Sequence, residues 1–171
     1  MCGHSNIVQH VSFCRDPHYL ITSSFDQTMR LWDVHTGQLL KTWPTQNTTY
    51  LSLAIHPDGG IVAAAGHDHT VRLVDVDTGR VFSALQGHSR TVEAVSFRPD
   101  GRLLASASHD GTIKLWAVAF KEAPFGSEAC LATLHAPGPY IGMNITGVLG
   151  ITDGQKATLL ALGAVEDDSA A

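Results

Sequence analysis

Cysteine and basic side chains are scarce in this sequence. The chain has 171 residues and 3 cysteines, and Cys2, Cys14 and Cys130 are odd in number and far apart. This usage is atypical of a small secreted fold held by disulfides, and it favours reduced thiols in a cytoplasmic protein. Lys and Arg number 11 against 16 Asp and Glu, for a formal net charge of −5, which argues against a surface that binds nucleic acid.

Long apolar runs and nucleotide-binding motifs are missing as well. No apolar run approaches the roughly 18 residues that span a membrane, and the N-terminal residues lack the pattern of a signal peptide. Gly59-Gly60 and residues 147–154 contain no Walker or dinucleotide fingerprint, so no nucleotide cofactor is expected. Hydrophobic residues still make up 44% of the chain, a fraction typical of globular proteins.

The sequence does contain an internal repeat. Residues 87–116 read GHSRTVEAVSFRPDGRLLASASHDGTIKLW, and the same frame fits 42 and 84 residues earlier. Two polar positions recur in step with this period: Asp26, Asp68 and Asp110, and Thr28, Thr70 and Thr112. A period of 42 without gaps predicts a repeat architecture.

Each repeat contains four short β-rich runs separated by turn residues. In the first repeat, residues 1–45, these runs are Val8–Phe13, Tyr19–Ser24, Thr28–Val34 and Leu39–Trp43. In the second, residues 46–86, they are Leu51–Ile55, Ile61–Ala65, Thr70–Val76 and Val81–Leu85. In the third, residues 87–136, they are Val92–Phe97, Leu103–Ser108, Thr112–Val118 and Cys130–Leu134, with seven extra residues within 120–128.

Three recurrent motifs carry a resemblance to a known family. Gly87-His88, Asp110 and Leu115-Trp116, echoed by Gly3-His4, Asp26 and Leu31-Trp32-Asp33, resemble the WD-repeat family of β-propellers over about three quarters of the chain. In such propellers four short strands make one blade. The resemblance implies an all-β fold, a partial propeller of three four-stranded antiparallel blades over residues 1–136. A tail with a short helix follows over residues 137–171.

The tail departs from the period of the repeats. Thr152-Asp153-Gly154-Gln155 predicts a helix capping box, with the helix continuing over 156–162 and Gly163 in the position of a C-terminal cap. Residues 139–166 resemble the C-terminal segment of prokaryotic WD-repeat proteins that couple their repeats to a nucleotide-binding switch.

The family resemblance also assigns roles to recurrent polar residues. In WD repeats a His, a Ser or Thr, an Asp and a Trp form a hydrogen-bonded tetrad within one blade. The resemblance assigns two such tetrads: His4, Thr22, Asp26 and Trp32, and His88, Ser106, Asp110 and Trp116. In the second repeat the other three positions hold Gln46, Ala64 and Val74, which leaves Asp68 alone.

His, a hydroxyl and Asp could also indicate a catalytic triad. A triad requires an exposed nucleophile and donors for an oxyanion. Here the set occurs twice at one spacing and no nucleophile-elbow motif is present. The resemblance also implies that Trp32 or Trp116 covers the hydroxyl. The structural role is therefore favoured, and the chain is predicted not to be an enzyme.

The triplet His67-Asp68-His69 could suggest a metal site. Two imidazoles beside a turn Asp provide no third or fourth ligand at a recognisable spacing, and no CxxC motif accompanies them. We therefore expect no metal ion and interpret the two histidines as turn residues exposed to solvent.

The predicted function is a non-catalytic scaffold that binds a protein or peptide through the rigid loops at one end of the blades. By position in the family frame, nine residues belong to that end: Ile7, Gln9 and Phe25; Thr49, Leu51 and His67; Thr91, Glu93 and His109. Phe25 and Leu51 are the apolar members and the expected anchors, with burial against a neighbouring blade as the alternative.

Two further functions stay open at this point. The chain could be the sensor portion of a larger prokaryotic switch ATPase or kinase, or a truncated product without a function of its own. Family propellers usually close with more than three blades, so apolar outer faces on blades one and three predict self-association or a longer propeller. The tail is expected to cover blade three through four apolar residues: Ile145, Val148, Leu149 and Leu159.

Overall fold

The fold is known from a computed structural model of the chain, which describes residues 3–118, 129–135, 146, 152–161 and 164–165. The chain divides into two compact units, Met1–Leu134 and His135–Ala171. The first unit contains the strands, apart from the last residue of β12, and the second contains a helix, α1. No helix in the described residues is long and apolar enough to cross a membrane.

The strands of the first unit form three four-stranded sheets. The first sheet contains β1 (Val8–Phe13), β2 (Tyr19–Ser24), β3 (Thr28–Asp33) and β4 (Leu39–Pro44). The second contains β5 (Tyr50–Ile55), β6 (Ile61–Gly66), β7 (Val71–Asp75) and β8 (Val81–Leu85). The third contains β9 (Val92–Phe97), β10 (Leu103–Ser108), β11 (Thr112–Ala117) and β12 (Cys130–His135).

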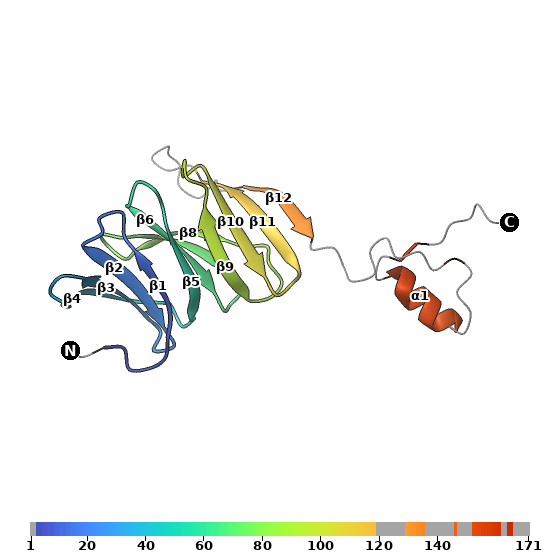
Figure 1. The fold of residues 1–171 in the computed structure, drawn as a ribbon, viewed down its shortest axis with the longest axis horizontal. Helices are drawn as coiled ribbons and strands as arrows, with labels where there is room; N and C mark the ends of the chain where they lie inside the picture. Colours follow the sequence, from blue (N-terminus) through green and yellow to red (C-terminus); the bar gives the residue numbers. More distant parts are fainter. Residues whose placement is uncertain (1–2, 119–128, 136–145, 147–151, 162–163, 166–171) are drawn as a thin grey trace. The chain divides into compact units, whose positions relative to one another are not determined.

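Strands that follow one another in sequence are neighbours within each sheet, and the registered pairs are antiparallel. The three sheets lie side by side as blades, with β1 against β5 and β5 against β9 (Figure 1). The prediction of an all-β partial propeller with three four-stranded blades is confirmed.

The first strand of each blade contains an irregularity at the same position. The pairing register skips one residue between Val8 and His10 and between Tyr50 and Ser52, and a matching shift occurs where β9 pairs with Ser108. An extra residue at such a β-bulge leaves the ladder and redirects its side chain. The bulged residues are Gln9, Leu51 and Glu93.

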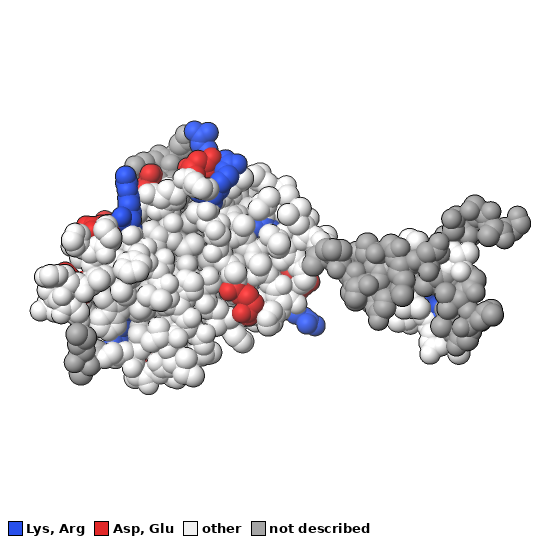
Figure 2. Space-filling view, in the orientation of Figure 1, with Lys and Arg blue, Asp and Glu red and all other residues white. Residues whose placement is uncertain are grey.

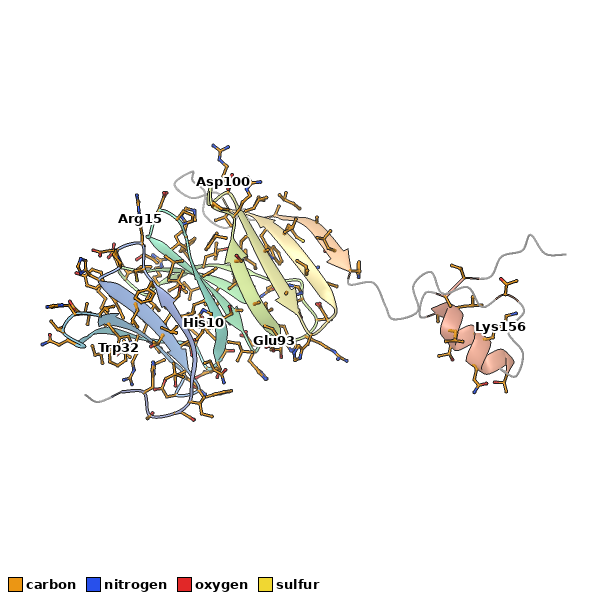
Figure 3. The ribbon with its side chains drawn as sticks, in the orientation of Figure 1. His10, Arg15, Trp32, Glu93, Asp100 and Lys156 are labelled. Atoms are coloured by element: carbon orange, nitrogen blue, oxygen red, sulfur yellow. The ribbon has the colours of Figure 1, made fainter. Side chains whose placement is uncertain are left out.

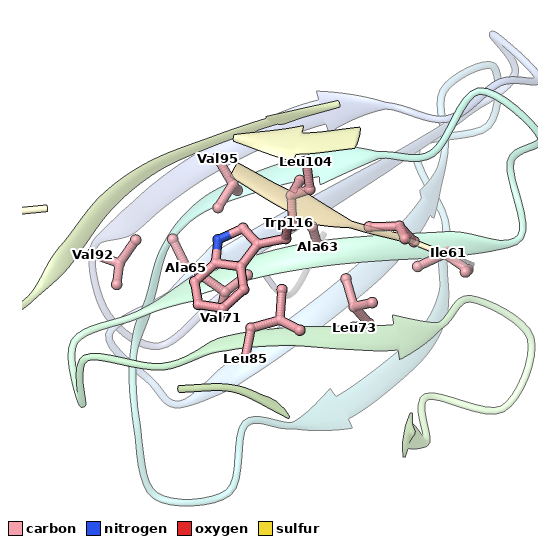
Figure 4. Packing of buried hydrophobic residues seen from close by; sticks show 11 residues of the cluster. Ile61, Ala63, Ala65, Val71, Leu73, Leu85, Val92, Val95, Leu104 and Trp116 are labelled. Carbon is pink, nitrogen blue, oxygen red and sulfur yellow. The ribbon is translucent and has the colours of Figure 1, made fainter. Parts of the chain in front are cut away.

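The apolar core consists of two joints between successive blades. The joint between blades one and two contains nine buried residues: Ile21, Met29, Leu31, Trp43, Tyr50, Leu53, Val62, Ala64 and Val74. The joint between blades two and three includes Ala63, Ala65, Val71, Leu73, Leu85, Val92, Val95 and Leu104, packed around the indole of Trp116 (Figure 4). Because alternate residues of β6 serve the two joints, all six of its residues are buried.

The helix α1 spans Asp153–Ala161 and begins with the predicted capping box. The amide of Gln155 donates to the Thr152 hydroxyl over 3.3 Å, and the amide of Thr152 donates to the Gln155 side chain over 2.9 Å. These two bonds satisfy donors that a helix N-terminus otherwise leaves free. The expected cap at Gly163 and the insertion within 120–128 lie outside the described residues, as do Ile145, Val148 and Leu149.

Candidate functional site

In the first blade, the side chains of His4, Thr22, Asp26 and Trp32 form a continuous hydrogen-bonded chain. His4 Nδ1 lies 2.8 Å from Asp26 Oδ2, and His4 Nε2 lies 2.6 Å from Thr22 Oγ1. The indole N–H of Trp32 donates to the same hydroxyl oxygen over 2.9 Å. These hydrogen bonds join the segment before β1 to β2, to β3 and to the tight turn between β2 and β3.

The third blade repeats this arrangement with serine in place of threonine. His88 Nδ1 lies 2.8 Å from Asp110 Oδ2, and His88 Nε2 lies 2.8 Å from Ser106 Oγ. Trp116 donates to Ser106 Oγ over 2.9 Å. Each polar side-chain atom of these four residues has a hydrogen-bond partner, as burial of polar groups requires.

The carboxylate of Asp26 is held in its ionised form. Burial alone would raise its pKa, but hydrogen bonds from Thr28, His4 and the Ser5 amide outweigh burial and hold the pKa of Asp26 far below its ordinary value. The pKa of Asp110 is lowered against burial in the same way, by Thr112, His88 and the Ser89 amide. An ionised Asp accepts the Nδ1 proton, so in the neutral ring Nε2 accepts from the hydroxyl.

The hydroxyl groups of Thr22 and Ser106 are buried and already hydrogen-bonded. Ser106 is 1% exposed and Thr22 is 8% exposed, and each oxygen already accepts an indole N–H. The hydrogen bonds through these hydroxyls tie the strands of each blade together.

The second blade corrects the expectation that Asp68 is left alone. The Nη1 and Nη2 groups of Arg72 each donate a hydrogen bond to the Asp68 carboxylate, with Nη1 at 2.9 Å from Oδ1. The guanidinium carbon also lies 6.0 Å from the centroid of the Tyr50 ring. Burial opposes the charge, but the Arg72 bonds lower the pKa of Asp68. In this blade Arg72 is therefore the side-chain partner of the turn Asp, where the other two blades have a histidine.

The sequence contained a signal for this ion pair. Arg30, Arg72 and Lys114 are separated by the same period of 42 and lie four residues after the turn Asp of each repeat. In the first blade Arg30 Nη2 also reaches Asp26 Oδ2, at 3.5 Å. The hydroxyls of Thr28 and Thr112, which each donate to the turn carboxylate over 2.6 Å, were signalled in the same way.

The nine residues assigned to one end of the blades lie in three equivalent trios. A backbone N–H in the tight turn donates to the residue before the first strand in each blade: Phe25 to Ile7 at 2.9 Å, His67 to Thr49 at 2.9 Å and His109 to Thr91 at 3.0 Å. The third member of each trio is the bulged residue, Gln9, Leu51 or Glu93. We call this set the bulge edge.

The bulge edge offers both apolar and polar side chains to solvent. Phe25 is 39% exposed, Ile7 is 64% exposed, and Leu51 is half-buried. His67, Glu93 and His109 are exposed, with His109 Nε2 at 3.4 Å from Glu93 Oε1. Glu93 lies at one end of its sheet and Asp100 at the other (Figure 3). Phe25 thus presents apolar surface to solvent.

A further feature of the first unit is the distribution of its charged side chains and of the side chains that could bind a metal ion. On the face drawn in Figure 2, uncharged residues dominate, and charges of both signs gather along one rim of the first unit. Among the residues that the structure describes, no three or more His, Cys, Asp or Glu side chains come together as a metal site. His67 and His69 are both exposed, and His69 has a positive φ of 68° in its turn.

Comparison with known sequences places the repeats in one family. The sequence profile of the WD domain, G-beta repeat family matches residues 1–33, 37–75 and 79–117. Ribosome assembly protein 4 of Saccharomyces cerevisiae is 40% identical over 43 residues, which cover 25% of this chain and 8% of that protein. Small ribosomal subunit protein RACK1 of Candida albicans is 50% identical over 36 residues, 21% of this chain and 11% of that protein.

A third relative and two solved structures extend the comparison. Target of rapamycin complex subunit LST8 of Mus musculus is 38% identical over 52 residues, 30% of this chain and 16% of that protein. The structure of U3-55K superposes with a TM-score of 0.71 at 22% identity, over 79% of this chain and 41% of that one. The RRP9 WD40 repeats give the same TM-score and identity over 80% of this chain. The chain thus spans a small part of the length of these curated relatives.

Proposed function

This chain belongs to the WD domain, G-beta repeat family, and from that premise we propose that it is a non-catalytic scaffold that binds a protein partner through its bulge edge. The observation that carries the proposal is the threefold recurrence of this edge. Each blade contributes one bulged residue, one turn residue and one residue before its first strand, held by the same backbone bond. A rigid framework that presents variable side chains at one end is suited to recognition.

The composition of the bulge edge favours an extended peptide segment as the ligand. Phe25, Leu51 and Ile7 supply apolar surface, while Gln9, Thr49 and Thr91 supply hydrogen-bonding groups. A few apolar anchors with polar groups around them are typical of specific protein recognition. The formal net charge of −5 supports a protein partner over nucleic acid. A cytoplasmic location stays a prediction that rests on the scattered cysteines.

Peptide selection on the full chain tests this proposal. Peptides enriched from a random library are measured by calorimetry against the wild type, the double variant Phe25→Ala/Leu51→Ala, and Leu40→Ala. Leu40 is the matched control because it is 44% exposed and lies outside the bulge edge. We expect the double variant to bind at least about tenfold more weakly and the control to match the wild type. Enrichment of no peptide, or loss of binding in the control alone, would contradict the proposal.

The absence of catalysis is also a proposal, supported by the covered hydroxyls of Ser106 and Thr22. A panel of ester and peptide substrates should show no turnover above buffer. Turnover that disappears in Ser106→Ala would prove this part of the proposal wrong.

A further inference from the structure

Each blade has two apolar faces, and the joints show what each face contacts. The leading face of a blade packs against the preceding blade, and the trailing face packs against the following one. In the third blade the leading face consists of Val92, Val95, Leu104, Trp116 and Val118. In the second blade the trailing face that meets it includes Ala63, Val71, Leu73 and Leu85.

The leading face of the first blade repeats the same positions but is open to solvent. Val11 corresponds by the period of 42 to Leu53 and Val95. Val11 is 57% exposed, whereas Leu53 is 3% and Val95 is 8% exposed. Around Val11, the residues Val8 and Phe13 are 49% and 62% exposed. Within the described residues, this face therefore carries the side chains of a joint without the partner blade.

The trailing face of the third blade is open in the corresponding way. Ile113 corresponds to Met29 and Val71, which are 1% and 0% exposed, yet Ile113 is 42% exposed. Leu134 occupies the position of Leu85 on the last strand and is 50% exposed. A shallow hollow of about 230 Å³ lies on this blade, and its lining consists of Phe97, Leu103, Ala105 and Leu115 with Ser96 and Arg98. Large apolar patches of this kind mark interaction sites.

We propose that a second copy of this chain docks the leading face of its first blade onto the trailing face of the third blade. In the two internal joints the buried side chains are Ala, Val, Leu, Tyr and Trp on the leading faces and Ala, Val, Ile, Leu, Met and Trp on the trailing faces. The open faces offer residues of the same types at the same positions. The joint bond between Ser52 Oγ and the Val95 amide is missing there, because Ala94 stands at the position of Ser52. That side-chain hydrogen bond therefore has no counterpart in the proposed contact.

This contact is heterologous, because it joins two different surfaces of the same chain. Heterologous contacts continue until the assembly closes into a ring or extends as a filament. The arrangement makes a prediction that a symmetric patch-to-patch dimer does not. A variant with a defect in one face keeps the other face intact. A mixture of a leading-face variant and a trailing-face variant therefore still has one intact face of each kind, and these two faces can form a single contact.

The test uses the full chain and three single substitutions. Val11→Asp places a charge on the leading face and Ile113→Asp places one on the trailing face, and both side chains are exposed enough to accept an aspartate without refolding the blade. Leu160→Asp is the matched control, because Leu160 is 39% exposed and lies on α1 in the second unit. Far-ultraviolet circular dichroism and thermal melting establish that each variant is folded.

Sedimentation velocity across a wide concentration range is the measurement. We expect concentration-dependent association of the wild type and of Leu160→Asp, with association at least about tenfold weaker for Val11→Asp and for Ile113→Asp alone. An equimolar mixture of these two variants should form a one-to-one heterodimer. A wild type that stays monomeric, folded face variants that associate normally, a mixture without heterodimer, or dissociation caused by Leu160→Asp would each overturn the proposal.

Discussion

Asp110 joins three segments of the third blade through its carboxylate. It accepts from the ring of His88, the amide of Ser89 and both the amide and the hydroxyl of Thr112. Its side chain is 7% exposed, so water does not replace these bonds readily. An alanine at this position would leave a buried imidazole and two amides without their acceptor.

Asp110→Ala should therefore destabilise the fold by about 1–3 kcal/mol, the usual penalty for unpaired buried polar groups. Asp68→Ala is the comparison, because Asp68 pairs with Arg72 at a site where its side chain is 38% exposed. Ion pairs that water can reach contribute roughly 0–1 kcal/mol, so the loss there should be smaller. Urea denaturation of the two variants measures both losses, and an equal or larger loss at Asp68 would prove the structural assignment wrong.

The lowered pKa values of Asp26 and Asp110 predict how stability depends on pH. The ordinary value for these carboxyls is 3.8, and both folded values lie below it. The unfolded chain therefore binds protons first as the pH falls, so the contribution is complete above the unfolded pKa and is lost progressively below it.

Urea denaturation at about pH 5 and about pH 3 should show this loss, and Asp110→Asn should reduce it, because the amide does not titrate. The variant will be less stable at the higher pH, so the comparison concerns the difference between the two pH values. An unchanged difference in Asp110→Asn would show that the Asp110 carboxyl is not the group that titrates.

Two residues at this scale show how far the sequence could predict the site. The positions of His88 and Ser106 followed from the family resemblance, and the structure brings both within 2.8 Å of each other. The pairing of Asp68 with Arg72 does not follow from the resemblance, because the family tetrad has no basic residue at the position of Arg72. A family pattern specifies the usual hydrogen-bond partners of the turn Asp, and it does not predict a different partner such as Arg72.

At the scale of the elements, the turns beside the joints show how closely blades approach each other. His56, before β6, lies with Nε2 at 3.2 Å from the carbonyl oxygen of Gly101, in the turn before β10. Its ring also packs edge-on against Phe97, with centroids 5.1 Å apart. A Cβ at Gly101 would collide with the His56 ring. The turn of blade three can therefore approach blade two only with glycine at this position.

Gly101→Ala should accordingly be more destabilising than Gly111→Ala. Both glycines have positive φ, 75° and 79°, so both substitutions carry a similar backbone penalty of roughly 1 kcal/mol. A Cβ at Gly111 meets nothing within 4 Å, whereas at Gly101 it displaces His56 from a buried joint. Thermal unfolding of the two variants gives the difference, and equal melting temperatures would contradict the tight contact.

The strands themselves were largely predictable from the sequence. The run expected at Thr28–Val34 is β3 at Thr28–Asp33, and the run expected at Thr70–Val76 is β7 at Val71–Asp75. The bulges were missed although a signal was present. Apolar residues in the first strand of each repeat are spaced by three and then by two, as in Val8, Val11 and Phe13. One extra residue in a strand produces that spacing.

At the scale of the whole molecule, the repeat determines which parts can be predicted. Residues at equivalent positions share the same hydrogen bonds in blades one and three, so the period alone relates His4 to His88. Exposure does not follow the period, because it depends on what lies against a blade. Leu53 is buried by the blade before it while Val11, at the same position, is 57% exposed. The expectation of uncovered outer faces on blades one and three came from the number of repeats, and no single repeat contains it.

Recognition of a partner is proposed to take place at the bulge edge. The most direct measurement is amide hydrogen exchange or amide chemical shift in the full chain, with and without a selected peptide. We expect the perturbed amides to include those of Phe25, His67 and His109, which hold the edge together in the three blades. Perturbation confined to the opposite end of the blades, around Arg15, Asp58 and Asp100, would contradict it.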